Sequence, residues 1–295
     1  MPRIATNGIE LEYESFGGAK SPALLLIMGL GAQMILWDEE FCELLAGRGF
    51  RVIRFDNRDV GGSTKLEHAG APNVAGALAA VAQGRPPQAP YTLHDMAEDT
   101  VGLLGALGID AAHVVGASMG GMIAQTLAIR HPRRVRTLTS IMSTTGNPAL
   151  PPANPAAMRV LVTPAPMERG PYIEHHIEVA KVIGSPGFPF DTEAVRSRAA
   201  RTFDRGVFPA GVARQLVAIL ASGNRKPALS SVRAPTLVIH GLADPLIPIA
   251  AGRDTAEAVP GAEFFEIEGM GHDLPREVWP RLVDAIAKNA ARAAA

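Results

Sequence analysis

A serine lies between closely spaced glycines in the stretch GASMG, at residues 116–120. Two β-branched valines, Val114 and Val115, come just before the turn, and the residues after the serine continue with helical spacing. A G-x-S-x-G turn between a strand and a helix holds its serine strained and exposed, as in a nucleophile elbow. The pattern therefore predicts that Ser118 is a nucleophile, although a serine that begins a helix is also a common N-cap.

A serine hydroxyl needs a base that accepts its proton and a third group that orients that base. In nucleophile-elbow sites the chain order is serine, acid, histidine, with the last two on loops after later strands. Asp244 follows the apolar run TLVIHG, and His272 follows the run AEFFEIEG. We therefore expect Ser118, Asp244 and His272 to form a catalytic triad. Asp273 is the alternative acid, but a residue adjacent to His272 would point its side chain away from the ring it has to orient.

Acyl transfer at such a serine also needs backbone N–H groups that stabilise the negatively charged oxygen. One donor is expected at Met119, directly after the nucleophile, and the other at Leu30, in the loop after the apolar run ALLLIM. Apolar, flexible side chains near these two positions predict an apolar substrate pocket. The expected pocket residues are Met28, Met34 and Leu36, for which a place in the apolar core is the alternative.

Other residues with chemical potential favour structural roles. Asp56 and Asp59 belong to the stretch FDNRD, in which ion pairing and turn capping are a better explanation than a catalytic carboxylate pair. His175 and His176 are adjacent but lack further ligands at a suitable spacing, so we expect no metal site. The single cysteine, Cys42, excludes an internal disulfide, and its helical surroundings predict a buried structural thiol.

The elements that must position these residues alternate along the chain. Apolar runs predict strands at 10–15, 23–28, 51–56, 112–116, 135–142, 235–241 and 262–269. Helical patterns occupy 38–48, 92–107, 119–131 and 274–291. This alternation predicts an α/β protein in which helices cover both faces of a mostly parallel sheet with an antiparallel edge.

Two segments interrupt the alternation. Residues 66–91 are rich in Ala, Pro and Gly and predict a surface excursion with one short helix. Residues 147–232 contain helical fragments without a strong strand, which predicts a helical cap inserted before the strand that carries the acid. The expected organisation is a core made of residues 1–146 and 233–295, with 147–232 as the cap.

The composition argues against several classes of partner. The 295 residues carry a formal net charge of -1, which gives no general attraction to nucleic acid or to an acidic membrane surface. No signal peptide is recognisable, and no apolar run approaches the ~20 residues of a membrane span. We therefore expect a soluble, cytoplasmic protein that binds a small molecule and neither nucleic acid nor membrane, with its oligomeric state left open.

A resemblance to a known family is carried by the stretches IMGLGAQMILW, FDNRDVGGST, HVVGASMGG, HGLADPLIP and EGMGHDLP. Together they resemble the α/β-hydrolase superfamily and are most similar to the aclacinomycin methylesterase type of serine carboxylesterase. The resemblance covers nearly the whole core and is weakest in 66–91 and in the cap. It implies the α/β-hydrolase fold, with Ser118, Asp244 and His272 as the triad and Leu30 and Met119 in the oxyanion hole.

The same resemblance implies hydrolysis of a carboxylic ester through an acyl-enzyme, without cofactor or metal. The apolar residues near Ser118 predict that this ester is small to medium in size and mainly apolar. Many family members carry His-Gly where this chain has Met28-Gly29, a difference that keeps the backbone donor but changes the pocket wall. Three alternatives stay open. A cofactor-free perhydrolase of the haloperoxidase-like type and a C–C bond hydrolase would use the same triad, and a non-catalytic ligand receptor of this fold can retain it.

Overall fold

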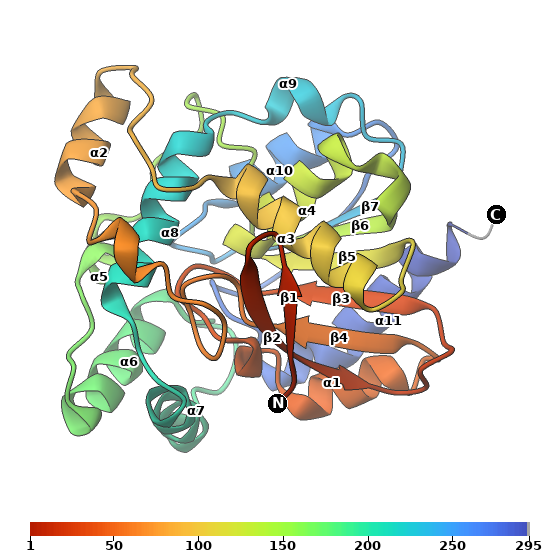
Figure 1. The fold of residues 1–295 in the computed structure, drawn as a ribbon, viewed down its shortest axis with the longest axis horizontal. Helices are drawn as coiled ribbons and strands as arrows, with labels where there is room; N and C mark the ends of the chain where they lie inside the picture. Colours follow the sequence, from red (N-terminus) through yellow and green to blue (C-terminus); the bar gives the residue numbers. More distant parts are fainter. Residues whose placement is uncertain (294–295) are drawn as a thin grey trace.

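The computed structural model describes residues 1–293, which form an eight-stranded sheet with helices on both faces (Figure 1). The strands are β1 (Arg3–Thr6), β2 (Ile9–Phe16), β3 (Ala23–Ile27), β4 (Arg51–Phe55), β5 (Ala112–Ala117), β6 (Val135–Ile141), β7 (Thr236–Gly241) and β8 (Glu263–Ile267). Their order in the sheet is β1-β2-β4-β3-β5-β6-β7-β8. The β1–β2 and β2–β4 pairs are antiparallel and the other pairs are parallel. The predicted α/β architecture with an antiparallel edge is confirmed.

Two layers of helices bury the two faces of this sheet. One layer consists of α1 (Glu39–Ala46) and α11 (Trp279–Ala291), and the other of α3 (Leu93–Ala106), α4 (Met119–Arg130) and α10 (Ile249–Ala258). Along β3, Leu24 and Leu26 pack in the α1 and α11 layer, whereas Leu25 and Ile27 pack in the layer of α3 and α4. The run ALLLI is continuously apolar because successive side chains of this central strand enter different buried layers.

Five helices lie between β6 and β7, in the interval for which the sequence predicts a cap. They are α5 (Pro155–Val162), α6 (Arg169–Ile183), α7 (Thr192–Asp204), α8 (Pro209–Ser222) and α9 (Lys226–Leu229). Helices α5 to α8 gather on the left of Figure 1, and α6 and α7 enclose a small apolar cluster around Tyr172 and Ile177. The predicted surface excursion contains α2 (Val74–Ala82), which packs against α8. In the part of the chain that the structure describes, no helix is long and apolar enough to cross a membrane.

Candidate active site

Ser118 occupies the turn between β5 and α4, with backbone angles of φ 55° and ψ -120°. A positive φ is strained for a residue with a Cβ, so surrounding contacts must hold it. The Ser118 N–H donates to the carbonyl of Ile141 at 2.9 Å, and the Ser143 hydroxyl donates to the Ser118 carbonyl at 2.8 Å. Ser118 occupies the N-cap position of α4, but its hydroxyl makes no capping hydrogen bond to the helix.

Glycines around Ser118 allow the turn to pack tightly. A Cβ on Gly116 would lie 2.1 Å from the carbonyl oxygen of Gly120, and a Cβ on Gly120 would lie 2.0 Å from that of Ile27. Real Cβ atoms do not approach this closely, so both positions of the GASMG stretch require glycine. The G-x-S-x-G spacing is therefore a packing requirement of the strand-turn-helix geometry that presents the serine.

His272 lies on the loop after β8 and Asp244 on the loop after β7. Together with Ser118 they form one chain of hydrogen-bond contacts, with His272 in the middle. The Nε2 atom of His272 is 3.0 Å from the Ser118 Oγ, and its Nδ1 is 2.7 Å from the Asp244 Oδ2. The other Asp244 oxygen accepts the N–H groups of Leu246 at 2.9 Å and Ile247 at 2.8 Å. With Nδ1–H donating to the carboxylate, Nε2 is free to accept the serine proton.

A second histidine, His240, supports the loop that carries Asp244. Its Nε2 is 2.7 Å from the carbonyl of Ile247 and 3.6 Å from the Asp244 Oδ2, and its ring is fully buried. Burial lowers the pKa of His240, although the bond to Ile247 and the nearby carboxylate oppose this effect. A neutral His240 carries no positive charge, so it does not compete with His272 for the negative charge of Asp244. Sequence reasoning assigned His240 no role, and its only signal is the four-residue spacing to the acid.

Asp273, the alternative acid, contacts the segment between α6 and α7, which lies in the predicted cap. Its carboxylate accepts a hydrogen bond from the Ser185 hydroxyl, in the connection between α6 and α7. Burial raises the pKa of Asp273, against the opposing effect of that hydrogen bond. In this structure, Asp244 contacts the ring of His272 and Asp273 points to Ser185.

The loop after β3, which carries Leu30, passes beside the nucleophile. A Cβ on Gly29 would lie 3.2 Å from the Cβ of Ser118. Three side chains hold the loop, as Asn57 donates to the Met28 carbonyl at 3.0 Å, Gln215 accepts the Gly31 N–H at 2.8 Å and Asp56 accepts the Met34 N–H at 2.6 Å. Met119 begins α4, where backbone N–H groups lack helical acceptors. The assignment of Leu30 and Met119 to the oxyanion hole stays a prediction that this arrangement permits.

The three predicted pocket residues lie in or beside the same loop. Met28 is buried and Leu36 half-buried, and both pack with Trp37 and Phe41 in the layer of α1 and α11. Met34 is fully buried. Their contact with a substrate stays a prediction.

The carboxylates of the stretch FDNRD form ion pairs with arginines from the segment between β6 and β7, so their predicted structural role is confirmed. Asp56 pairs with Arg205 at 2.7 Å, directly after α7. Asp59 accepts two hydrogen bonds from Arg214 of α8, at 2.8 Å and 2.7 Å. Burial raises the pKa of Asp59, but hydrogen bonds from Arg214, the Leu66 N–H and Tyr91 outweigh it and hold the pKa below its usual value.

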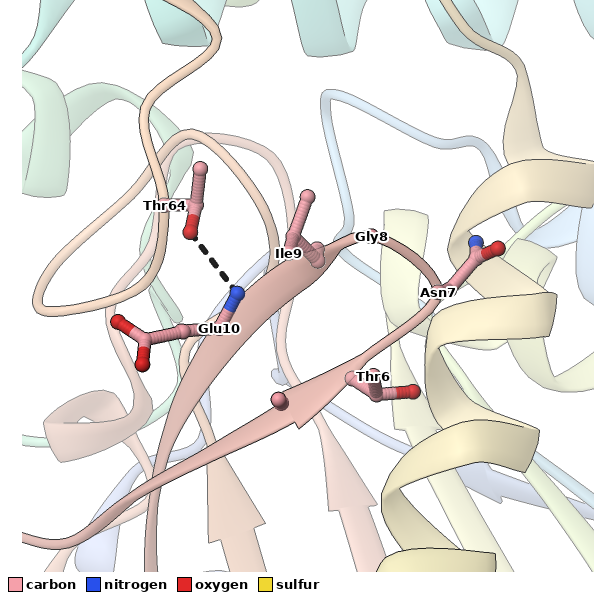
Figure 2. Close-up of a pocket in the computed structure, with 7 residues that line it drawn as sticks. Thr6, Asn7, Gly8, Ile9, Glu10 and Thr64 are labelled. Atoms are coloured by element: carbon pink, nitrogen blue, oxygen red, sulfur yellow. Dashed lines mark hydrogen bonds between the residues drawn. The ribbon is translucent and has the colours of Figure 1, made fainter.

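Two other features lie outside the triad. A surface hollow at the turn between β1 and β2 is lined by Thr6, Asn7 and Glu10 with their neighbours, and Thr64 accepts the Glu10 N–H there at 2.9 Å (Figure 2). Cys42 is fully buried, and burial raises the pKa of its thiol to about 12, in agreement with the structural role predicted for it. Among residues 1–293, no group of three or more His, Cys, Asp or Glu side chains is placed to hold a metal ion.

A family model and two relatives place the chain in one family, and a solved structure shares its fold. A family model described as alpha/beta hydrolase fold matches residues 22–169. The rhodomycin D methylesterase DnrP of Streptomyces peucetius is 31% identical over 97% of each chain. The rhodomycin D methylesterase DauP of Streptomyces sp. (strain C5) is 30% identical over 96% of this chain and 95% of its own. Among solved structures, a meta-cleavage product hydrolase from Pseudomonas fluorescens IP01 has a TM-score of 0.76 at 18% identity, covering 99% of this chain and 98% of its own.

Proposed function

The chain belongs to the α/β-hydrolase fold family, and we propose that it is a serine hydrolase of a small-to-medium, mainly apolar carboxylic ester. The observation that carries the proposal is the contact chain from Ser118 through His272 to Asp244 on a strained strand-turn-helix elbow. Such a triad can hydrolyse a small-molecule ester with water and needs no cofactor to do so. Residues 147–232 are proposed to act as the cap over this site.

In the proposed reaction, His272 accepts the Ser118 proton while Oγ bonds to the ester carbonyl carbon. The tetrahedral intermediate then loses the alkoxy group, which takes the proton from His272 and leaves an acyl-enzyme. Water then gives a proton to His272 while its oxygen bonds to the acyl carbon. The second tetrahedral intermediate breaks its bond to Oγ, so the acid is released and the Ser118 Oγ takes the proton back from His272. Asp244 stabilises the imidazolium in both halves, and the N–H groups of Leu30 and Met119 stabilise the oxyanion by about 3 kcal/mol per donor.

The relatives support an ester as the substrate. Two of them, related to this chain over nearly their whole length, are named as methylesterases. The meta-cleavage product hydrolase shares the fold at 18% identity, so it supports no particular reaction for this chain. Hydrolysis of a C–C bond and transfer to peroxide use the same triad chemistry, and both are outcomes of the test below.

The test is labelling of the chain with a fluorophosphonate probe, together with turnover of p-nitrophenyl esters with and without peroxide and of a diketone. We expect one label per chain, at Ser118, and Ser118→Ala should abolish both labelling and ester turnover. Ser230→Ala is the matched control, because it removes an exposed hydroxyl that bonds only to the Pro227 carbonyl. Labelling at another residue would contradict the proposal. A diketone or peroxide preferred over ester and water would replace it, and labelling without any turnover would favour a receptor.

A further inference from the structure

The segment between α6 and α7 lies directly on the loop that carries His272. We call residues 183–187 the strap and residues 269–273 the histidine loop. The His272 N–H donates to the carbonyl of Ile183 at 2.7 Å, and the Gly187 N–H donates to the carbonyl of Gly269 at 3.0 Å. The strap therefore binds the backbone of the candidate base itself, from a part of the chain more than 80 residues away.

One side chain of the strap binds both neighbours of His272. The Ser185 Oγ accepts the Gly271 N–H at 2.8 Å, and the Ser185 hydroxyl donates to the Asp273 carboxylate. The residues before and after His272 are thus fixed by a single hydroxyl. No other side chain of the strap hydrogen-bonds the histidine loop among the residues that the structure describes.

Glycines on both sides allow the two backbones to meet. A Cβ on Gly187 would lie 2.5 Å from the Cα of Gly269, and a Cβ on Gly271 would lie 2.2 Å from the carbonyl oxygen of Gly184. Neither approach is open to a residue with a side chain. The strap and the histidine loop are therefore in direct backbone contact, in addition to their hydrogen bonds.

The histidine loop has no regular structure of its own to hold it. Residues 268–275 lie between β8 and the 3-10 helix Arg276–Val278 and belong to neither strand nor helix. The Nε2 of His272 must nevertheless stay at 3.0 Å from the Ser118 Oγ. Reactive groups need placement to about 0.5 Å, and a misplacement of about 1 Å can cost ~100-fold in rate.

From these contacts we propose that Ser185 is a positioning residue for His272, and that the strap is the part of the cap that holds the base within reach of Ser118. The inference rests on the proposed function, because the placement of His272 affects the rate only if it is the base. Ser185 does not touch the substrate in this proposal. It acts through the backbone on either side of the histidine.

The test compares Ser185→Ala with the wild-type chain. We expect kcat to fall about 10- to 100-fold, with KM changed less than twofold, because base placement and not substrate binding is lost. The rate of fluorophosphonate labelling at Ser118 should fall in the same proportion, and the low-field NMR signal of the Nδ1 proton shared with Asp244 should broaden. Ser185→Thr, which keeps the hydroxyl, should restore most of the rate.

One variant serves as a control and another as a second test. Ser230→Ala makes the same chemical change at an exposed cap position and should leave kcat and labelling unchanged. Gly187→Ala keeps every hydrogen-bonding side chain but forces the strap away from Gly269, so it should reproduce the fall in kcat and labelling even where Ser185→Ala folds poorly.

The outcomes separate the two proposals. A wild-type chain that the probe does not label overturns the proposed function. A wild-type chain that is labelled, with folded Ser185→Ala or Gly187→Ala labelled and turning over at the same rate, overturns the positioning role alone. A fall in kcat that Ser185→Thr does not restore also overturns it, because the hydroxyl would then not be the group that matters.

Discussion

Two carboxylates lie close to His272, and their partners differ. Asp244 uses one oxygen for the ring Nδ1 and the other for two backbone N–H groups, so its orientation is fully fixed. Asp273 faces Ser185 in the strap. An acid that orients an imidazole has to contact the nitrogen opposite the one that takes the proton, and only Asp244 does so.

We therefore expect Asp244→Asn to lower kcat by about 10⁴-fold, because the amide favours the wrong tautomer of the ring. Asp273→Asn should cost less than about tenfold, because the amide oxygen can still accept from Ser185. Steady-state kinetics on one ester, with folding checked by circular dichroism, measure both variants. If the larger loss came from Asp273→Asn, the acid assignment would be wrong while the pair of Ser118 and His272 could stand.

His113 gives the stability of the chain a dependence on pH. Its ring is buried against Phe50, and its Nδ1 lies 3.0 Å from the Thr137 hydroxyl. Burial, with a smaller effect from the charge of Arg136, lowers the pKa of His113 to about 4 from the ordinary value of 6.5. Below pH 6.5 the imidazole of His113 becomes protonated in the unfolded chain, whereas in the folded chain it stays neutral until about pH 4. The free energy of unfolding therefore decreases as the pH falls through this window.

We expect this site to contribute ~2 kcal/mol of the loss in unfolding free energy between pH 7 and pH 5. His113→Gln should lack that part of the loss, because glutamine does not titrate. Urea unfolding of both chains at the two pH values measures the difference. An equal pH dependence in the variant would mean that the ring is protonated in the folded chain.

At the scale of elements, α8, which lies in the proposed cap, binds two loops of the proposed core. Its Gln215 is fully buried, accepting the Gly31 N–H and donating to the Arg58 carbonyl at 2.7 Å. One residue earlier, Arg214 pairs with Asp59, and these two side chains are 1% and 0% exposed. The helix therefore sets the position of the predicted oxyanion loop while it neutralises a buried charge of the core.

Arg214→Met should lower the free energy of unfolding by about 3–5 kcal/mol, because it leaves the Asp59 carboxylate buried without its cation. The double variant Arg214→Met with Asp59→Asn should recover much of the loss, since no buried charge then remains. Urea unfolding of the single and double variants measures both effects. A double variant as unstable as Arg214→Met alone would show that lost packing, and not the unpaired charge, is the cause.

The core elements and the candidate triad could be predicted because their signals are local. Ser118, Asp244 and His272 each follow an apolar run by a few residues, and glycine spacing marks the elbow. Helix α10 gave a weak signal and was not predicted, because the side it buries consists of Ala251, Gly252, Asp254 and Thr255, with no large apolar residue. Strand β1 is only four residues long and was not delimited.

The contacts of the cap could not be predicted in the same way. Ser185 and Gln215 are ordinary polar residues in their own surroundings, and their partners lie 86 and 184 residues away in the sequence. Neither spacing nor periodicity records such contacts, which only the folded arrangement of cap on core brings together. The carboxylates of FDNRD were assigned to ion pairing, but the sequence did not show that the arginines come from the cap.

For the molecule as a whole, substrate choice is expected to arise where the cap meets the core. Val212 of α8 lies against the loop at Gly31, where a Cβ would be 3.0 Å from its methyl groups, so an apolar side chain borders the predicted oxyanion loop. Burying each further CH₂ of an acyl chain is worth up to ~0.8 kcal/mol, whereas an unpaired carboxylate there would be costly. The proposed site should therefore favour neutral acyl groups of moderate length.

Accordingly, kcat/KM for neutral p-nitrophenyl esters should rise from acetate to about butyrate or hexanoate, by up to about fourfold per CH₂, and then fall. Initial rates across the series measure this preference. A charged hemisuccinate ester should react more slowly than its neutral methyl analogue. Acetate as the best ester, or a preference for the hemisuccinate, would require a small or cationic pocket instead.

The ion pairs between the proposed cap and the proposed core limit which cap segments can be exchanged between related proteins. Arg205 and Arg214 belong to the cap, while their counter-ions Asp56 and Asp59 belong to the core, both with fully buried side chains. A chimera whose cap segment came from a relative without these two arginines would keep Asp56 and Asp59 buried without their cations, which would destabilise its fold. An exchange of the cap should therefore include all four positions, so that each arginine keeps its carboxylate.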